Sequence, residues 1–185
     1  MGFLAQLDGF DPSSLDPLQR ILLITDGTLT DTLEAAFLEP VGLRKIAADI
    51  LPAADPVPAL ALGANETLLI RKIVLYGETT GRPYVYAESL LALDRLPPRF
   101  REELMHSDTP MGRLWSEYKM ETWKELLHVA RHPAQEIAPY LELAPEVECL
   151  MRRYRLISGG RPLMIIEEQF PAVFNTGVPP GLDPR

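Results

Sequence analysis

The range 152–171, near the C-terminus, is the part of the sequence that most constrains the fold. Two runs rich in apolar and β-branched residues flank the tetrapeptide 158–161, Ser-Gly-Gly-Arg. Paired glycines adopt the positive φ angles that a tight chain reversal needs, and the flanking runs have the composition of strands. The sequence therefore predicts a β-hairpin here.

Charged residues are distributed unevenly over the two arms of this hairpin. Because strand side chains alternate between faces, Arg153 and Arg155 share one face of the first arm. On the second arm, Glu167 and Glu168 must point to opposite faces. Glu167 shares its face with Leu163 and Ile165, and Glu168 shares its face with Met164, Ile166 and Phe170. Either carboxyl group is set among hydrophobic neighbours, where loss of hydration suits it to acid or base chemistry. The alternative is that both glutamates pair with the arginines on a solvated sheet edge.

The overall composition is that of a globular protein with one domain. The 185 residues are 46% hydrophobic and 24% charged, which is enough to bury a core. The net charge of −8 argues against a nucleic acid as partner, because proteins that bind its backbone usually carry a basic stripe. A small anionic ligand stays open, since it needs only one or two local cations.

The sequence carries no motif for a metal site or for export. The single cysteine, Cys149, excludes an intrachain disulfide and fits a reducing compartment. There is no signal peptide and no apolar run as long as a membrane span, so we expect a cytoplasmic protein. His128 and His132 have the i, i+4 spacing of a helix face, but Pro133 follows directly and no HExxH pattern is present. We therefore expect a solvated helix end there and no metal.

The range 68–76, Leu-Leu-Ile-Arg-Lys-Ile-Val-Leu-Tyr, is the clearest strand in the chain. Arg71 is the only charged member of a row that otherwise contains Leu69, Ile73 and Leu75. An arginine on such a core-facing row rarely stays unpaired, so it should meet a buried protein carboxylate or the carboxylate of a ligand. The range 84–91 returns as a second strand, and its Glu88 is a candidate partner for Arg71 across the hairpin.

Two segments have the character of exposed helix starts. The range 25–30, Thr-Asp-Gly-Thr-Leu-Thr, precedes a predicted helix at 32–37 that Thr30 or Asp31 caps. Pro110 opens a second helix, in the first turn that proline prefers. Unsatisfied amides and the helix dipole favour an anion at such a start. For the first segment the alternative is an ordinary loop with a helix cap.

Four segments now stand together along the chain. They are Leu69-Ile-Arg71 followed by Tyr84-Val-Tyr-Ala-Glu-Ser, then Thr109-Pro-Met-Gly-Arg113, then Ser158-Gly-Gly-Arg-Pro-Leu-Met-Ile-Ile-Glu167 ending at Phe170-Pro171. Their order and spacing resemble the chorismate lyase family, in particular the branch with a Thr-Asp-Gly-Thr start and a Tyr-Ala-Glu-Ser strand. The resemblance spans residues 18–171, most of the chain.

The resemblance implies one α+β domain, in which helices pack on an antiparallel sheet and a buried ligand pocket lies beneath helical flaps. The domain would comprise residues 1–185, with its core at about 18–171 and a C-terminal tail at 172–185. The resemblance also implies an enzyme that converts chorismate to 4-hydroxybenzoate and pyruvate without a metal or an organic cofactor. The expected partners are therefore this substrate and this product.

The family's two main site residues can be carried over by position. The strand arginine that binds the ring carboxylate corresponds to Arg71. The family's acid lies five residues after the hairpin proline, here Pro162, and four before the closing proline, here Pro171. This count assigns the acid to Glu167 rather than to Glu168. We expect Arg71 to hold the ring carboxylate and Glu167 to donate a hydrogen bond or proton to the departing enolpyruvyl oxygen.

The resemblance also implies two backbone amides that help to hold the carboxylate. The amide of the Thr-Pro-x-Gly motif corresponds to Met111. The amide in the N-terminal loop corresponds to Leu29 or Thr28, because the better-studied branch of the family has a shorter loop here.

One residue departs from the family pattern on the enolpyruvyl side. Glu88 stands where the better-studied branch has an arginine, so the contacts of the side-chain carboxylate must differ here. We expect Arg155, or Arg153, to hold that carboxylate.

The main alternative to an enzyme is a binding module. Ligand-sensing domains of some bacterial transcription regulators share this fold and bind small acids without chemistry. They normally follow a DNA-binding domain, for which we expect no room before Leu18, and the presence of Arg71 and Glu167 favours an enzyme. A lyase for a related substrate, such as an amino-substituted chorismate, is a third alternative. The single domain favours a monomer.

Overall fold

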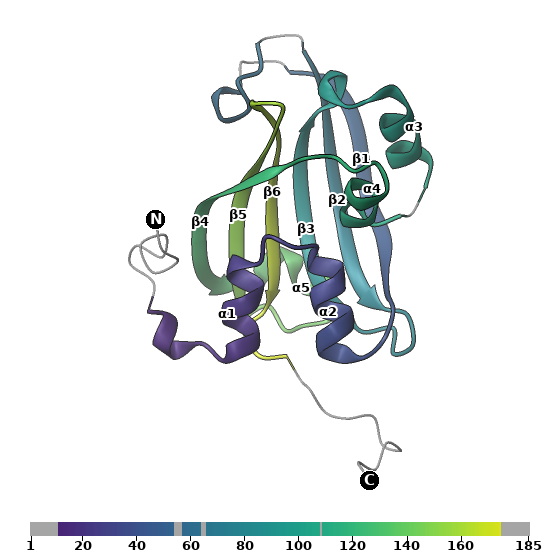
Figure 1. The fold of residues 1–185 in the computed structure, drawn as a ribbon. Helices are drawn as coiled ribbons and strands as arrows, with labels where there is room; N and C mark the ends of the chain where they lie inside the picture. Colours follow the sequence, from purple (N-terminus) through teal and green to yellow (C-terminus); the bar gives the residue numbers. More distant parts are fainter. Residues whose placement is uncertain (1–10, 54–56, 64–65, 108, 175–185) are drawn as a thin grey trace.

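The computed structural model describes residues 11–53, 57–63, 66–107 and 109–174. They form one domain around a six-stranded antiparallel sheet in the order β1-β2-β3-β6-β5-β4 (Figure 1). The strands are β1 (Val41–Pro52), β2 (Thr67–Gly77), β3 (Pro83–Ala92), β4 (Trp123–Pro133), β5 (Glu148–Ser158) and β6 (Arg161–Pro171). The α-helices are α1 (Pro17–Ile24), α2 (Leu29–Phe37), α3 (Pro98–His106), α4 (Met111–Glu117) and α5 (Ala138–Leu141). Short 3-10 helices are η2 (Pro12–Ser14), η3 (Pro58–Leu60), η4 (Leu93–Arg95) and η5 (Gln135–Ile137). The predicted α+β fold is confirmed.

Both predicted hairpins are present. β5 and β6 form the hairpin predicted at 152–171, and Gly159 and Gly160 turn the chain with φ angles of 55° and 74°. These angles lie in the left-handed region that glycine enters without steric cost. The strands predicted at 68–76 and 84–91 are β2 and β3, which pair antiparallel along their length. The local signals of turn residues and β-branched runs were sufficient here.

Helices α1 to α4 cover one face of the sheet (Figure 1). α1 and α2 pack their leucines against the lower part of this face, and α3 and α4 pack against the upper part. A capping box between Asp16 and Gln19 starts α1. α2 starts three residues before the predicted 32–37, with Thr28 as its N-cap. The loop between α1 and α2 is thereby held over the middle of the sheet.

The opposite face of the sheet has a thinner cover. α5 and η5 pack against Val74 and Tyr86, and η3 packs against Leu68 and its neighbours. The two faces therefore bury separate groups of side chains from alternate positions of the same strands.

The segment 114–130, which has no clear periodicity in the sequence, forms the end of α4 and most of β4. The pairing of β4 with β5 shifts by one residue between Leu126 and His128. Such a bulge interrupts the alternation of faces, which explains the irregular pattern. His128 and His132 thus lie on a strand, so the expected helix end is wrong. Within the ranges that the structure describes, no group of three or more His, Cys, Asp or Glu side chains could hold a metal ion.

The ends of the described chain add little to the sheet. Phe174 packs against the cluster under α1 and α2, whereas residues 175–185 of the predicted tail lie outside the described residues. None of the described helices is long and apolar enough to cross a membrane.

Candidate active site

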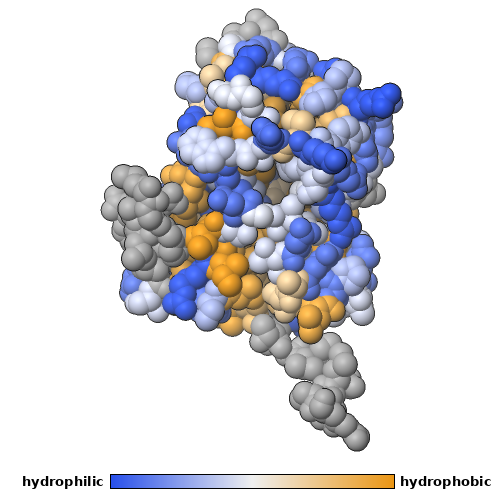
Figure 2. Space-filling view, in the orientation of Figure 1, coloured by the Kyte–Doolittle hydropathy of each residue, from blue (hydrophilic) through white to orange (hydrophobic). Residues whose placement is uncertain are grey.

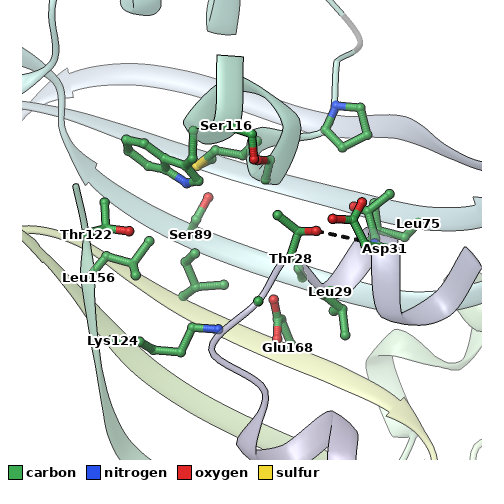
Figure 3. Close-up of a pocket in the computed structure, with 18 of the residues that line it drawn as sticks. Thr28, Leu29, Asp31, Leu75, Ser89, Ser116, Thr122, Lys124, Leu156 and Glu168 are labelled. Atoms are coloured by element: carbon green, nitrogen blue, oxygen red, sulfur yellow. Dashed lines mark hydrogen bonds between the residues drawn. The ribbon is translucent and has the colours of Figure 1, made fainter. Parts of the chain in front are cut away.

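A cavity of about 530 Å³ lies between the sheet and the starts of α2 and α4 (Figure 3). Its walls mix polar and apolar side chains, and the apolar ones include Ile73, Leu75, Met111, Trp115, Leu156 and Ile166. In the space-filling view of the helix-covered face, a hollow lies near the middle of the molecule, with both polar and apolar residues around it (Figure 2). A cavity of this size, with apolar walls beside converging polar groups, is typical of a site for a small organic ligand.

Arg71 of β2 lines this cavity and is only 2% exposed. It stands opposite Ser89 of β3, which also lines the cavity. Arg71 thus lies where it could contact a ligand in the cavity, and its binding of a ligand carboxylate stays a prediction. A buried guanidinium at the wall of an apolar cavity can bind a carboxylate strongly, because little water competes for it.

Glu88 does not reach Arg71. The register places Glu88 opposite Lys72, on the other face of the sheet. There its carboxylate accepts hydrogen bonds from Lys72 Nζ at 3.0 Å and from the Tyr86 hydroxyl at 2.6 Å. Glu88 is therefore neither the partner of Arg71 nor a lining residue of this cavity, because its strand position has the opposite parity.

Glu168 of β6 is the buried carboxylate of the cavity. Arg152 Nε donates to it at 2.5 Å, and the Tyr154 hydroxyl donates to its other oxygen at 2.8 Å. Burial and the charge of Glu168 raise the pKa of Tyr154 well above its usual value, so the hydroxyl keeps its proton. Burial opposes the charge of Arg152, but the carboxylate beside it outweighs burial and raises the Arg152 pKa. Both oxygens of Glu168 are thus held in place.

The structure does not bring Glu167 to Arg71. Arg153 donates to Glu167 from Nε at 2.9 Å and from Nη2 at 2.5 Å, on the far face of the sheet. Glu167 borders a second hollow there, together with Glu88 and His128. The position assigned by counting from the prolines therefore lies outside the cavity, and the neighbouring Glu168 lies inside it.

The reason is the register across three strands. Arg71 stands opposite Ser89, and Ser89 stands opposite Ile166. Residues that stand opposite each other in antiparallel strands project to the same face, so even-numbered residues of β6 share the face of Arg71. Glu168 therefore belongs to the cavity face and Glu167 to the other face.

The two predicted helix starts do meet at the cavity. Thr28, Leu29 and Met111 all line it, and Figure 3 shows Thr28 and Leu29 at its edge. The first amides of a helix have no partner inside the helix, so those of α2 and α4 are available near the cavity. These three predicted residues are thus brought together with Arg71.

The starts of α2 and α4 also contact each other. A Cβ atom built on Gly112 would lie 2.8 Å from Thr28 Cγ2, so only glycine fits at this contact. Arg113 Nη2 lies 2.5 Å from Glu34 Oε1, which links the two helices again. The roof of the cavity is therefore one connected unit.

Arg155 lies away from the cavity. Its guanidinium donates to Glu125 Oε2 at 2.5 Å and to the carbonyl of Ala59 at 3.0 Å. Like Arg153, it projects to the far face of the sheet. The expectation that Arg155 or Arg153 holds the enolpyruvyl carboxylate is therefore wrong for a ligand in this cavity, because neither side chain lines it.

Lys124 of β4 is a cavity residue that the sequence analysis missed. Its Nζ donates to the carbonyl of Thr25 at 2.7 Å and lies 4.6 Å from the centre of the Tyr154 ring. Burial is the main cause that lowers its pKa to about 8. In the sequence, Lys124 could be recognised as a strand residue only because it alternates with Leu126 on one face. The bulge after Leu126 interrupts this alternation.

Three charged groups that line the cavity come from strands of the sheet and follow its strand order. Arg71 lies on β2, Glu168 on β6 and Lys124 on β4, so a carboxylate stands between two cations. Figure 3 shows Lys124 and Glu168 entering the cavity from neighbouring parts of its floor. The two cations can bind a molecule with two anionic groups, and the carboxylate between them can accept or donate a proton.

The sequence matches one family of known proteins. The family model described as chorismate pyruvate-lyase Rv2949c-like matches residues 23–176. A protein named chorismate pyruvate-lyase from Mycobacterium leprae (strain TN) is 33% identical over 158 residues, which are 84% of this chain and 75% of that protein. A protein of the same name from Mycobacterium tuberculosis (strain ATCC 25618 / H37Rv) is 31% identical over 158 residues, which are 82% of this chain and 78% of that protein.

Solved structures with a similar fold come from transcription regulators. PhnF from Mycobacterium smegmatis superposes with a TM-score of 0.65 at 13% identity, over 80% of this chain and 65% of that chain. The ligand-binding domain of a putative GntR-family regulator from Bordetella bronchiseptica has a TM-score of 0.54 at 24% identity, over 70% of this chain and 84% of that chain. At such identities the likeness shows a shared fold and no more.

Proposed function

The chain belongs to the chorismate pyruvate-lyase family of the Rv2949c-like type, and on this premise we propose that it eliminates pyruvate from chorismate to give 4-hydroxybenzoate. The observation that carries the proposal is the cavity itself, in which the buried Arg71 and the buried Glu168 line one apolar space. The substrate is a small ring with two carboxylates, and a space of about 530 Å³ accommodates it.

Arg71 binds the ring carboxylate in this proposal. The first amides of α2 and α4, at Leu29 and Met111, support the same carboxylate from the roof, with Thr28 beside them. The apolar walls hold the ring and exclude water. Positioning of this kind accounts for much of the rate, because aromatisation of the ring already supplies the driving force.

Glu168 takes the acid–base role that the resemblance assigned to Glu167. As the C3–O bond breaks, its electron pair leaves with the enolpyruvyl oxygen, and the electrons of the C4–H bond complete the aromatic ring. Glu168 accepts the C4 proton and returns it to the enolpyruvate, which becomes pyruvate. Arg152 and Tyr154 keep the carboxylate aligned through both transfers. Each step is a proton transfer or a bond cleavage within the substrate, so the proposal needs no cofactor.

The two adjacent glutamates provide a matched test. The proposal predicts that Glu168→Gln lowers kcat by about 100-fold or more, the usual contribution of a positioned acid–base group. Glu167→Gln, on the far face, should change kcat less than about twofold. Release of pyruvate and 4-hydroxybenzoate from chorismate is followed by chromatography, in parallel samples with and without the chelator EDTA.

Three other outcomes would change the conclusion. Full activity in Glu168→Gln with loss in Glu167→Gln would return the acid role to Glu167. Loss of turnover on chelation would contradict the cofactor-free mechanism. No turnover by the unmodified protein, but tight binding of 4-hydroxybenzoate, would make it a small-acid-binding domain, a function that the fold of the regulator domains also accommodates.

A further inference from the structure

The inference concerns Lys124, and it rests on the proposed function. Lys124 extends from β4 along the floor of the cavity toward the loop before α2 (Figure 3). The carbonyl of Thr25 is the one hydrogen-bond acceptor that its Nζ contacts among the described residues, at 2.7 Å. An ammonium group carries three donors, so further donors are available to a ligand.

Lys124 and Arg152 are neighbouring cations whose hydrogen-bond donors are only partly used. Arg152 also points toward the Thr25 carbonyl, with Nη1 at 3.4 Å, while its Nε holds Glu168. The other terminal nitrogen, Nη2 of Arg152, is buried and has no hydrogen-bond partner within the described ranges. Asp26 and Glu168 are the carboxylates that face Lys124, and Glu168 is already bound by Arg152. The unused donors of Lys124 and Arg152 Nη2 can therefore bind a carboxylate of a ligand.

Arg71 and Lys124 reach the cavity from well-separated strands of the sheet. Arg71 on β2 and Lys124 on β4 are separated by four strand spacings, which at about 4.8 Å each is roughly 19 Å between backbones. Both side chains line the same cavity, which has a volume of about 530 Å³. A ring that carries two carboxylates would lie between these two cations, within this volume.

We propose that Lys124, supported by Arg152, binds the enolpyruvyl carboxylate of chorismate, while Arg71 binds the ring carboxylate. Glu168 then lies between the two anchors, beside the bond that breaks and the hydrogen that leaves. Lys124 takes the place that the sequence analysis gave to Arg155 or Arg153, both of which project to the far face. It is the residue that distinguishes the dianionic substrate from the monoanionic product, which keeps only the carboxylate at Arg71.

Two unreactive probes separate binding from catalysis. 3-(Carboxymethoxy)benzoate carries both carboxylates and 3-ethoxybenzoate carries only the ring carboxylate, and neither can undergo the elimination. Isothermal titration calorimetry on the unmodified protein should show about 10- to 100-fold tighter binding of the dicarboxylate, the usual effect of one charge-assisted hydrogen bond in a buried site.

The variants identify the residue that produces this preference. Lys124→Met should abolish the preference for the dicarboxylate and leave the affinity for 3-ethoxybenzoate unchanged, which a merely structural role would not do. Lys124→Arg should restore the preference. Lys119→Met is the matched control, because Lys119 is an exposed lysine at the rim of the same cavity.

The outcomes separate this inference from the proposed function. A preference that survives Lys124→Met, or that disappears in Lys119→Met instead, would overturn the role of Lys124 even if chorismate is converted. Loss of the preference in Lys124→Met would support that role even if the unmodified protein does not convert chorismate. The binding data therefore test the carboxylate site, and the product analysis tests the reaction.

Discussion

Two ion pairs between β5 and β6 differ in little except the face on which they lie. Arg152 pairs with Glu168 on the cavity face, and their side chains are 1% and 7% exposed. Arg153 pairs with Glu167 one position along, on the far face, and their side chains are 51% and 21% exposed. Both pairs have a shortest distance of 2.5 Å. The same residue types at the same strand spacing thus occupy very different environments.

The difference shows that burial, rather than the identity of the pair, determines what each carboxylate can do. Beside Glu167, water screens the charges and the pair adds little to stability. Beside Glu168, the apolar cavity strengthens each interaction and makes an unbalanced charge costly. The buried pair is therefore the one whose carboxylate can act on a substrate.

The largest expected effect is on stability. Arg152→Met leaves Glu168 as an uncompensated buried charge, so we expect the free energy of unfolding to fall by about 3–5 kcal/mol. Arg153→Met should lower it by less than about 1 kcal/mol, because that pair is exposed. Urea unfolding followed by circular dichroism measures both values.

A double variant sharpens this result. If the cost of Arg152→Met comes from the uncompensated carboxylate, then adding Glu168→Gln to it should recover much of the lost stability. Equal losses in Arg152→Met and Arg153→Met would contradict the distinction between the two faces.

The second effect concerns ligand binding by two neighbouring cations of β2. Arg71 lines the cavity, whereas Lys72 projects to the far face and pairs with Glu88. We expect Arg71→Met to weaken binding of 4-hydroxybenzoate by about 1.5–3 kcal/mol, the value of a hydrogen bond to a charged group. Lys72→Met should leave binding unchanged. Calorimetric titration with 4-hydroxybenzoate decides the point, and equal losses in the two variants would place the ligand elsewhere.

The third and smallest effect is a pH dependence that two lysines on opposite faces should show differently. Glu88 is the main cause that raises the pKa of Lys72, whereas burial lowers the pKa of Lys124 to about 8. As the pH rises through about 8, Lys124 loses its charge and the dianionic substrate loses one anchor. We therefore expect kcat/KM for chorismate to fall by about 10-fold between about pH 7 and about pH 9.5.

Arg152 and Tyr154, which also lie beside Lys124, should not cause the fall in kcat/KM, because both have a raised pKa and keep their protons in this range. The carboxylates that face Lys124 are Asp26 and Glu168. Lys124→Arg should remove the fall, because arginine stays charged. A fall of the same size in Lys124→Arg would assign it to another group.

Much of the fold could be predicted because its signals are local. Gly159 and Gly160 mark one turn, and the aliphatic runs of β2 and β3 mark a second hairpin. β4 could not be predicted, because a bulge after Leu126 breaks the alternation on which strand prediction depends. No local pattern indicates where a bulge will form.

The site was predicted in part, and for a related reason. Arg71 is conspicuous as the one charge on an aliphatic row, and it does line the cavity. The choice between Glu167 and Glu168 depends on which row of β6 faces the helices. That choice is made by pairing with β3, far away in the sequence, so alternation along β6 offers both rows equally. Lys124 was not predicted as a site residue for the same reason, because pairing with β5 determines the face to which it projects.

The close contact between Gly112 and Thr28 has a consequence for how this family can diverge. A side chain at position 112 would overlap Thr28, at a Cβ to Cγ2 distance of 2.8 Å. A side chain at position 112 is therefore tolerated only after the side chain at position 28 has changed. Because the Thr28 Cβ would also lie 2.9 Å from a Cβ atom at position 112, we expect the two positions to covary among relatives, so that a residue larger than glycine at 112 accompanies glycine at 28.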